Sequence, residues 1–224
     1  MVTIKNLDDG TSGATALHGK RAGAPIENVV PCFTPGTVIA TPTGERRVED
    51  LCIGDRVLTR DNGLQEIRWI GSCRLAAEDL RAAPDLRPVL IRSGALDFGL
   101  PEQDILVSPW HNVLIQNDKA AAFFEDSEVL SAAGHLTGLD GIDVVDVEQV
   151  TYIHFMFDQH QVVLSNGFWT ESFRPDEAVM NGLGLRQRNQ ILDLFPNLRD
   201  APGRKAYQTA RRALSRDESR LLIG

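Results

Sequence analysis

Cys32 is the residue of this sequence whose type and position most clearly suggest chemistry. It follows a short polar segment and begins the run Cys-Phe-Thr-Pro-Gly-Thr. A thiol at the first position of a domain can attack the carbonyl before it, here that of Pro31, and convert the Pro31–Cys32 amide into a thioester. This N-to-S acyl shift needs a thiolate-forming environment, an imidazole near the leaving nitrogen and donors for the developing oxyanion. The substrate would be the protein's own backbone.

Histidine and hydroxyl side chains further along the chain are candidates for these supporting roles. Ser108 and His111 form a Ser-x-x-His motif that directly follows an apolar run. The imidazole of His111 is the candidate general acid, and the hydroxyl of Ser108 can orient the amide or its oxyanion. His154 and His160 flank Asp158 in a strand-rich segment, and an extended chain would place both imidazoles on one strand face. We therefore include His154 among the catalytic candidates, with Asp158 and His160 as support.

Each candidate also has a structural interpretation. An isolated cysteine is usually a small buried hydrophobe, an isolated histidine often packs in a core, and Asn166-Gly167 by itself is a turn. The joint order of these features favours chemistry, with Asn166 as a further supporting residue. A metal site formed by Cys32, His111 and His154 is an alternative, but no spacing motif supports it, and we predict neither a metal nor a cofactor.

Composition and charge exclude several classes of protein. The 224 residues carry a formal net charge of −8 and are 42% hydrophobic, with a pI of about 5.1. An acidic chain lacks the basic patches that bind nucleic acid or anionic membranes, so we expect neither as a partner. No run approaches the ~20 apolar residues of a spanning helix, and the N-terminal segment lacks the blocks of a signal peptide. We expect a soluble protein and predict no particular compartment.

The three cysteines do not form a disulfide framework or a Cys-x-x-Cys metal motif. They are widely spaced, at positions 32, 52 and 73. A disulfide between Cys52 and Cys73 is one interpretation, and buried thiols are the one that we favour.

The pattern along the chain divides it into three parts. Residues 1–31 carry turn and linker chemistry and are expected to form a flexible leader. Residues 32–175 show short strand-like runs separated by turns, which favours an antiparallel, mainly β domain over a βαβ sheet. Residues 176–224 are rich in Arg, Leu, Ala and Glu and are expected to form a helical tail. We interpret the basic residues of this tail as a solvated face.

The individual elements are expected from periodicity and turn residues. The clearest hairpin joins two runs through Asp61-Asn62-Gly63, a favourable tight-turn sequence. Strands are predicted at 37–41, 56–59, 65–70, 88–91, 104–107, 112–115, 144–157 and 161–164. Helical turns are predicted at 76–83 and 126–133, and helices at 177–184, 185–194 and 204–222.

The ordered set of motifs resembles the Hint module shared by hedgehog autoprocessing domains and inteins. It comprises Cys-Phe-x-x-Gly-Thr at the start, Gly-Asp-Arg-Val at residues 54–57, Ser-x-x-His, and a strand that ends in Asn-Gly. The bacterial Hint-type group is the most similar, and the resemblance covers roughly residues 30–175. It implies a compact all-β horseshoe with pseudo-twofold symmetry.

The resemblance also implies roles for individual residues. Cys32 matches the nucleophile of the acyl shift, and Ser108 with His111 matches the Thr-x-x-His of the family, with serine in place of threonine. His154 falls where inteins carry an aspartate that assists the acyl transfers. A count shifted by one residue gives Ile153, and we prefer His154 because only an imidazole can transfer a proton.

The C-terminal end of the resemblance departs from the intein pattern. Inteins end in His-Asn, and that asparagine cyclises to release the downstream flank. Glu171 and Ser172 occupy the equivalent positions here, and Phe173 offers no nucleophile. We therefore expect thioester formation and cleavage of the Pro31–Cys32 bond without splicing, as a single-turnover reaction.

The expected partners are the protein's own N-terminal segment as substrate and water or a small thiol or other nucleophile as acyl acceptor. Pro31, which supplies the scissile carbonyl, has two opposed effects: its ring hinders attack, and the bend that it imposes strains the bond. An inactive Hint-fold structural or interaction module is the alternative. The missing His-Asn and the short leader favour that alternative.

Overall fold

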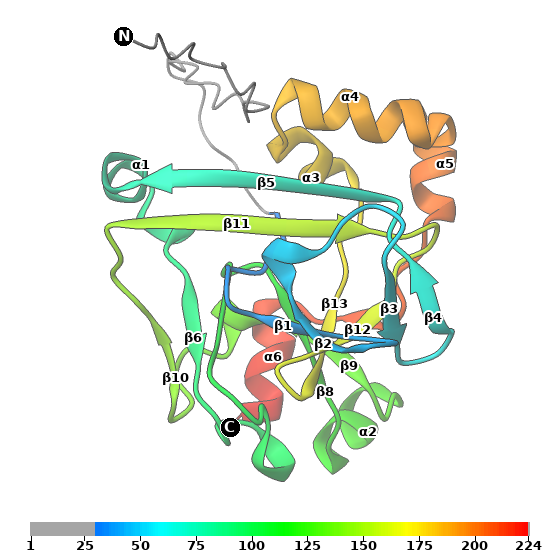
Figure 1. The fold of residues 1–224 in the computed structure, drawn as a ribbon. Coiled ribbons are helices and arrows are strands. Elements are labelled where there is room, and N and C mark those ends of the chain that lie inside the picture. The colour runs from blue at the N-terminus through cyan, green and yellow to red at the C-terminus, as the bar shows by residue number, and fades with distance from the viewer. Residues whose placement is uncertain (1–29, 224) are drawn as a thin grey trace, which may run out of the picture.

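The computed structural model describes residues 30–223, and it is built mainly of β-strands (Figure 1). The predicted leader therefore lies outside the described residues, apart from Val30 and Pro31. The strands are β1 Val38–Thr41, β2 Gly44–Arg47, β3 Arg56–Thr59, β4 Gly63–Glu66, β5 Trp69–Ala76, β6 Val89–Ile91, β7 Ile105–Val107, β8 Asn112–Ile115, β9 Val129–Ala132, β10 Ile142–Val144, β11 Gln149–Met156, β12 Val162–Ser165, β13 Phe168–Glu171 and β14 Arg212–Ala213. The α-helices are α1 Ala77–Ala82, α2 Asp118–Phe124, α3 Glu177–Gly182, α4 Leu185–Leu194, α5 Ala201–Ala206 and α6 Arg216–Ile223.

Three sheets organise these strands. The largest has the order β14-β9-β8-β13-β12-β1-β2, with the β3–β4 hairpin joined to β12. A three-stranded sheet has the order β10-β6-β7, and β5 pairs with β11 in a long two-stranded ribbon. All pairs are antiparallel except β14 with β9. The predicted mainly β class with helices towards the C-terminus is confirmed.

The predicted hairpin around Asp61-Asn62-Gly63 is present. Strands β3 and β4 pair with Thr59 opposite Gly63. Gly63 has φ +61, a left-handed conformation that glycine adopts without strain. The turn residues Asp61-Asn62-Gly63 therefore set the register of the β3–β4 hairpin.

Cys32 is positioned by the residue that follows it, Phe33. Phe33 forms isolated bridges with Ile153 of β11 and with Val107 of β7. Its N–H donates to Ile153 O (2.8 Å), and the N–H of Ile153 donates to Phe33 O (2.9 Å). Cys32 is thus held between two strands that are distant in sequence.

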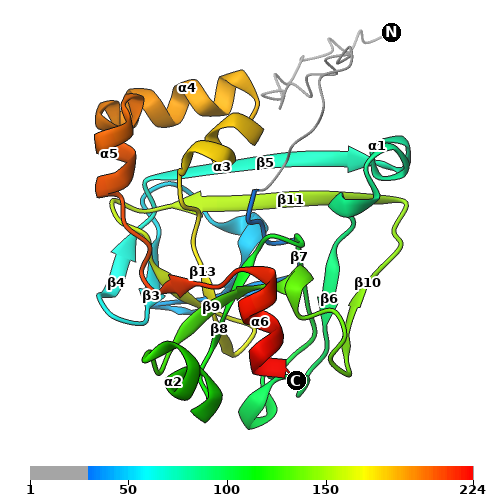
Figure 2. The same cartoon turned by 180° about the vertical axis from the view of Figure 1, so that it is seen from behind.

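The two largest apolar clusters of the core lie one on each side of the β5–β11 ribbon. The larger includes Phe33 and Phe155, whose rings stack at 5.3 Å. The other contains Cys32 and residues of α3 and α4, among them Met180 and Ile191. Figures 1 and 2 show α3 and α4 lying over this ribbon from both sides of the molecule. Helices α3 and α4 therefore cover the side of the ribbon on which Cys32 packs.

The helical turn predicted at 126–133 is wrong. Val129–Ala132 is strand β9, and all four of its residues are buried. β9 pairs with β8 and β14 and is buried on both faces. It therefore lacks the polar alternation that marks a strand with one solvated face. A helix that was not predicted, α2, precedes it, and the side chain of Asn117 caps α2 by accepting from Ala120 N–H (2.9 Å).

The C-terminal segment is only partly helical. α3 and α4 agree with prediction, but the single helix predicted over 204–222 is divided into α5, β14 and α6. Ser215 caps the N-terminus of α6. Its hydroxyl accepts from the backbone N–H of Glu218, and the carboxylate of Glu218 accepts from the backbone N–H of Ser215. Figure 2 shows α6 against β8 and β9, and Leu214 and Leu222 join the larger cluster.

Within residues 30–223, the helices are all too short or too polar to cross a membrane.

Replacement of Leu222 by alanine tests whether α6 is an integral part of the fold. Leu222 is 5% exposed, whereas its neighbour Leu221 is 48% exposed. We expect Leu222→Ala to lower the free energy of unfolding by about 2 kcal/mol or more, because it leaves a cavity. Leu221→Ala should change it by less than about 0.5 kcal/mol. Urea unfolding of both variants measures this, and equal effects would show that α6 does not pack as described.

Candidate active site

The thiol of Cys32 faces the imidazole of His154. Cys32 Sγ lies 3.2 Å from Nδ1 of His154 and 3.4 Å from the carbonyl oxygen of Val30. Cys32 is 3% exposed. Burial raises the pKa of the Cys32 thiol well above its usual range, and the hydrogen bond with Ser108 opposes that shift. The resting side chain is therefore a neutral thiol with a base beside it.

Antiparallel pairing explains this contact. Phe33 is opposite Ile153, so the preceding residue of one strand is opposite the following residue of the other. That register places Cys32 opposite His154. A shift by one residue would turn the imidazole to the other face of the ribbon.

Aromatic rings and a glycine fix the orientation of His154. Its ring stacks on Trp69 at 5.1 Å and lies 5.3 Å from Phe173. Opposite it on β5 is Gly71, where a Cβ would lie 2.6 Å from His154 Nε2. Burial lowers the pKa of His154 to about 4, although the nearby Gln187 of α4 opposes the shift. His154 is therefore neutral at pH 7 and able to accept a proton.

The Ser108 hydroxyl bridges the backbone on either side of Pro31. Its Oγ accepts from the N–H of Cys32 (2.9 Å) and donates to the carbonyl oxygen of Val30 (3.0 Å). Its backbone N–H donates to Cys32 O (3.0 Å). The nitrogen that must leave in an acyl shift therefore already contacts a hydroxyl.

His111 is buried next to the same segment. Its ring packs edge-on against Phe33 at 4.4 Å, and within the described chain neither ring nitrogen has a hydrogen-bond partner. Burial lowers the pKa of His111 to about 4; the charge of His160 adds to the shift and that of Glu171 opposes it. An imidazole with two unused nitrogens beside the nucleophile is available for proton transfer.

Two of the three supporting candidates, Asp158 and Asn166, contact other parts of the molecule. Asp158 is exposed and pairs with Arg68 (3.3 Å). Asn166, at φ +46, forms the β12–β13 turn, and its side chain accepts from Val38 N–H and donates to Asp104 O. These contacts are structural, as expected for an Asn-Gly turn.

The expectation that His154 and His160 share a strand face is wrong, because β11 ends at Met156 and the chain turns before His160. The Nδ1 of His160 accepts from Ala210 N–H (2.9 Å). Its Nε2 lies 3.3 Å from a carboxylate oxygen of Glu171. The two histidines therefore belong to different groups of polar residues.

Glu171 is the buried ionisable residue that the sequence analysis did not include in the site. It is 3% exposed, and its Oε1 accepts from the backbone N–H (2.9 Å) and the Nδ2 (2.8 Å) of Asn112. Burial alone would raise its pKa, but hydrogen bonding and charge from His160, the charge of His111 and the backbone of Asn112 together lower it. The available signal was a charged residue at an inward position of a strand.

Glu171 and Pro31 both line a cavity of about 240 Å³. Its lining residues are Pro31, Trp110, Asn112, Ala132, His135, Glu171, Arg174, Asp176, Ala178, Val179, Ala213 and Leu214.

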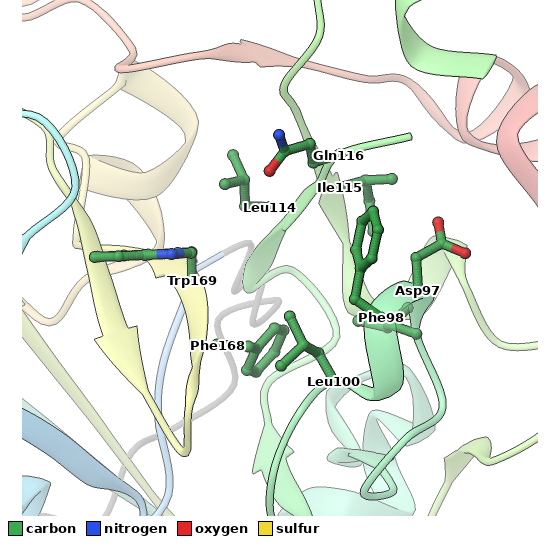
Figure 3. A pocket seen from close by; sticks show the side chains of 9 residues that line it. Asp97, Phe98, Leu100, Leu114, Ile115, Gln116, Phe168 and Trp169 are labelled. Carbon is green, nitrogen blue, oxygen red and sulfur yellow. The ribbon is translucent and has the colours of Figure 1, made fainter. Parts of the chain in front are cut away.

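A smaller hollow of about 50 Å³ contains none of the candidate residues. Figure 3 shows it between the loop that carries Phe98 and strands β8 and β13, with Leu100 beside Phe168. It is lined by Leu96, Asp97, Phe98, Leu100, Leu114, Ile115, Gln116, Phe168 and Trp169.

The other two cysteines, Cys52 and Cys73, lie at the surface of the molecule. All three cysteines are thiols, and Cys52 and Cys73 are exposed, so the prediction of burial is wrong for these two. Cys52 follows a 3₁₀ turn, and Cys73 lies on β5 in an exposed stretch of the strand. Between residues 30 and 223, no group of three or more His, Cys, Asp or Glu is placed to hold a metal ion.

The comparisons with known proteins identify the family. A model of the Hint domain family matches residues 31–177, more than half of the chain, and the chain therefore belongs to the Hint family. No curated protein matches.

Solved structures similar to this chain are inteins and intein-like domains. The gp41-1 intein is 16% identical, with a TM-score of 0.40, and the match covers 62% of this chain and 97% of the intein. The MchDnaB-1 intein is 13% identical, with a TM-score of 0.41 and coverage of 62% and 98%. A bacterial intein-like domain from Clostridium thermocellum is 15% identical, with a TM-score of 0.41 and coverage of 63% and 97%.

The two buried histidines predict a pH-dependent stability. The unfolded chain protonates His111 and His154 near pH 6.5, whereas the folded chain does so only near pH 4. Between these values the unfolded state binds more protons, so stability falls as pH falls, by about 1.4 kcal/mol per pH unit for each histidine. Urea unfolding between about pH 7 and 5 should show this slope, reduced in His111→Asn/His154→Asn. An unchanged slope in the double variant would contradict the assignment.

Gly71→Ala tests the packing that orients His154. The added methyl would lie 2.5 Å from the Trp69 ring and 2.6 Å from His154 Nε2. We expect a loss of about 1–3 kcal/mol of stability through overpacking. Ser72→Ala, at the adjacent exposed position, is the control and should change stability by less than about 0.5 kcal/mol. Thermal or urea unfolding of both variants makes the comparison.

Proposed function

We propose that this Hint domain processes itself by forming a thioester at Cys32 and cleaving the Pro31–Cys32 bond, without splicing. The observation that carries the proposal is the placement of Cys32 Sγ 3.2 Å from His154 Nδ1, together with Ser108 Oγ 2.9 Å from the scissile nitrogen. In this proposal residues 1–31 are the released segment and residues 32–175 are the processing domain.

The proposed first step transfers the acyl group from nitrogen to sulfur. His154 Nδ1 accepts the thiol proton, and the sulfur attacks the carbonyl carbon of Pro31. The C–S bond forms and the C–N bond breaks, so the Cys32 nitrogen leaves as an amine that gains one proton. The thiol proton taken by His154 balances the proton that the amine gains. His111 is the proposed general acid that delivers it; because its pKa is about 4, it is neutral at pH 7 and must first take that proton up. Ser108 Oγ is the hydroxyl in direct contact with the leaving nitrogen.

The burial of Cys32 and His154 slows this step. The pKa of the Cys32 thiol is raised and that of His154 is lowered by the same burial. Both shifts disfavour the thiolate–imidazolium pair that attack requires. We infer a single-turnover reaction whose rate depends on how far the site opens to solvent or to a nucleophile.

Splicing is not part of the proposal. Ser172 and Phe173, which follow the last residue of β13, are held in place by backbone hydrogen bonds to Gln161 and Phe155. Neither residue is an asparagine that could cyclise. The acyl acceptor in the proposal is therefore water or a small thiol or other nucleophile.

The second candidate function is an inactive Hint scaffold that serves as a structural or interaction module. The observation that favours it is the burial of Cys32, which belongs to the same apolar cluster as Val179 and Met180 of α3. In that case Cys32 is a core residue, and the chain retains residues 1–31.

Intact-mass measurement of freshly purified protein, with and without dithiothreitol or hydroxylamine, distinguishes the two. We expect a species shortened by residues 1–31, which increases with added nucleophile and is absent in Cys32→Ala. His154→Ala and His111→Ala should slow its formation by about 100-fold, because each removes a proton-transfer group. Cys52→Ala, at an exposed thiol, is the matched control and should cleave at the wild-type rate.

Two results would count against the proposal. Full-rate cleavage in Cys32→Ala eliminates the thioester mechanism. An unchanged full-length mass of the wild type under all conditions supports the inactive scaffold.

A further inference from the structure

We propose that the cavity beside Pro31 holds the water that hydrolyses the Cys32 thioester, and that Glu171 is the general base for this water. The inference rests on the proposed function and assigns its second step. Without a general base, the thioester would be resolved only by slow uncatalysed hydrolysis or by an added nucleophile.

The cavity has the right place and size for this role. It is lined by both Pro31, which carries the acyl carbonyl, and Glu171. Its volume is about 240 Å³, whereas a water molecule in the liquid occupies about 30 Å³. Several waters therefore fit in the cavity that Glu171 and Pro31 both line. Cys32 itself belongs to the apolar cluster under α3 and α4, so this cavity offers a polar approach to the acyl group.

The hydrogen bonds of Glu171 leave room for one water. A carboxylate has about four acceptor positions. Asn112 fills two of them on Oε1 with its backbone N–H and its Nδ2, and His160 Nε2 approaches Oε2 at 3.3 Å. One position on Oε2 remains for a water in the cavity.

The surroundings keep the carboxylate in the form that a general base needs. The donors from Asn112 and His160 stabilise the charged group, which offsets the cost of its burial. Arg174, which also lines the cavity, is engaged with Asp176 (2.7 Å). The hydrogen bonds from Asn112 and His160 therefore keep Glu171 ionised, and Arg174 is paired with Asp176 instead.

The hydrolytic step balances without another reactant. A water oxygen attacks the Pro31 carbonyl carbon of the thioester while Glu171 accepts a proton from the water. The C–S bond then breaks, and the sulfur of Cys32 takes up a proton, so that the thiol is restored. The products are a carboxylic acid that ends in Pro31 and a protein that begins with Cys32.

The experiment compares two ways of resolving the same thioester in the full-length chain. Cleavage in plain buffer made with H₂¹⁸O reports hydrolysis through ¹⁸O in the new Pro31 carboxyl group. Cleavage with dithiothreitol reports thioester formation, because this thiol attacks without a general base. We expect Glu171→Gln to slow hydrolysis by about 100-fold and to change dithiothreitol cleavage by less than threefold.

A second pair of variants tests the cavity without changing its buried polar groups. Ala178 lines the cavity from an exposed position on α3, and Glu177 is its exposed neighbour outside the lining. Ala178→Trp should narrow the cavity and slow hydrolysis at least fivefold, whereas Glu177→Trp should leave hydrolysis unchanged. Both variants should retain dithiothreitol cleavage.

Each outcome decides the inference. Equal slowing of both reactions in Glu171→Gln would show a structural role for Glu171 and overturn the assignment, as would unchanged hydrolysis in Glu171→Gln or Ala178→Trp. If the wild type forms no dithiothreitol-sensitive species, the proposed function fails and the hydrolytic step fails with it. If the thioester forms and only hydrolysis is insensitive to these variants, the proposed function stands and this inference alone is wrong.

Discussion

The candidate site depends on the pair of backbone hydrogen bonds between Phe33 and Ile153. These bonds fix the register between the segment that carries the nucleophile and β11, so the thiol of Cys32 meets the imidazole of His154. Because side chains alternate along a strand, a slip of one residue would separate the two groups. The stacked rings of Phe33 and Phe155 bury this pairing in the larger core cluster.

The same burial that holds the site also restrains its chemistry. Cys32 and His154 lie where charge is poorly solvated, so the neutral pair is favoured at rest. Helices α3 and α4 contribute to this burial from one side. The stability of the site and the rate of the proposed acyl shift are therefore opposed, and any motion that admits solvent would change both.

Two groups of buried polar residues carry the proposals. One contains Cys32, His154 and Ser108; the other contains Glu171 and His160. Asn112, next to His111 in sequence, donates to Glu171 of the second group. The proposed acyl shift uses the first group, and the proposed hydrolysis uses the second.

The sequence by itself determined the family, the mainly β class and most short strands, because turn residues and apolar runs act locally. It also selected Cys32, Ser108 and His111 as candidates, because their motif spacing is local. Tertiary structure alone decided that Val129–Ala132, within the predicted helical turn at 126–133, is a strand, since a strand buried on both faces has no distinguishing periodicity. It likewise decided the register that selects His154 and the burial of Glu171, because both arise from contacts between segments far apart in the chain.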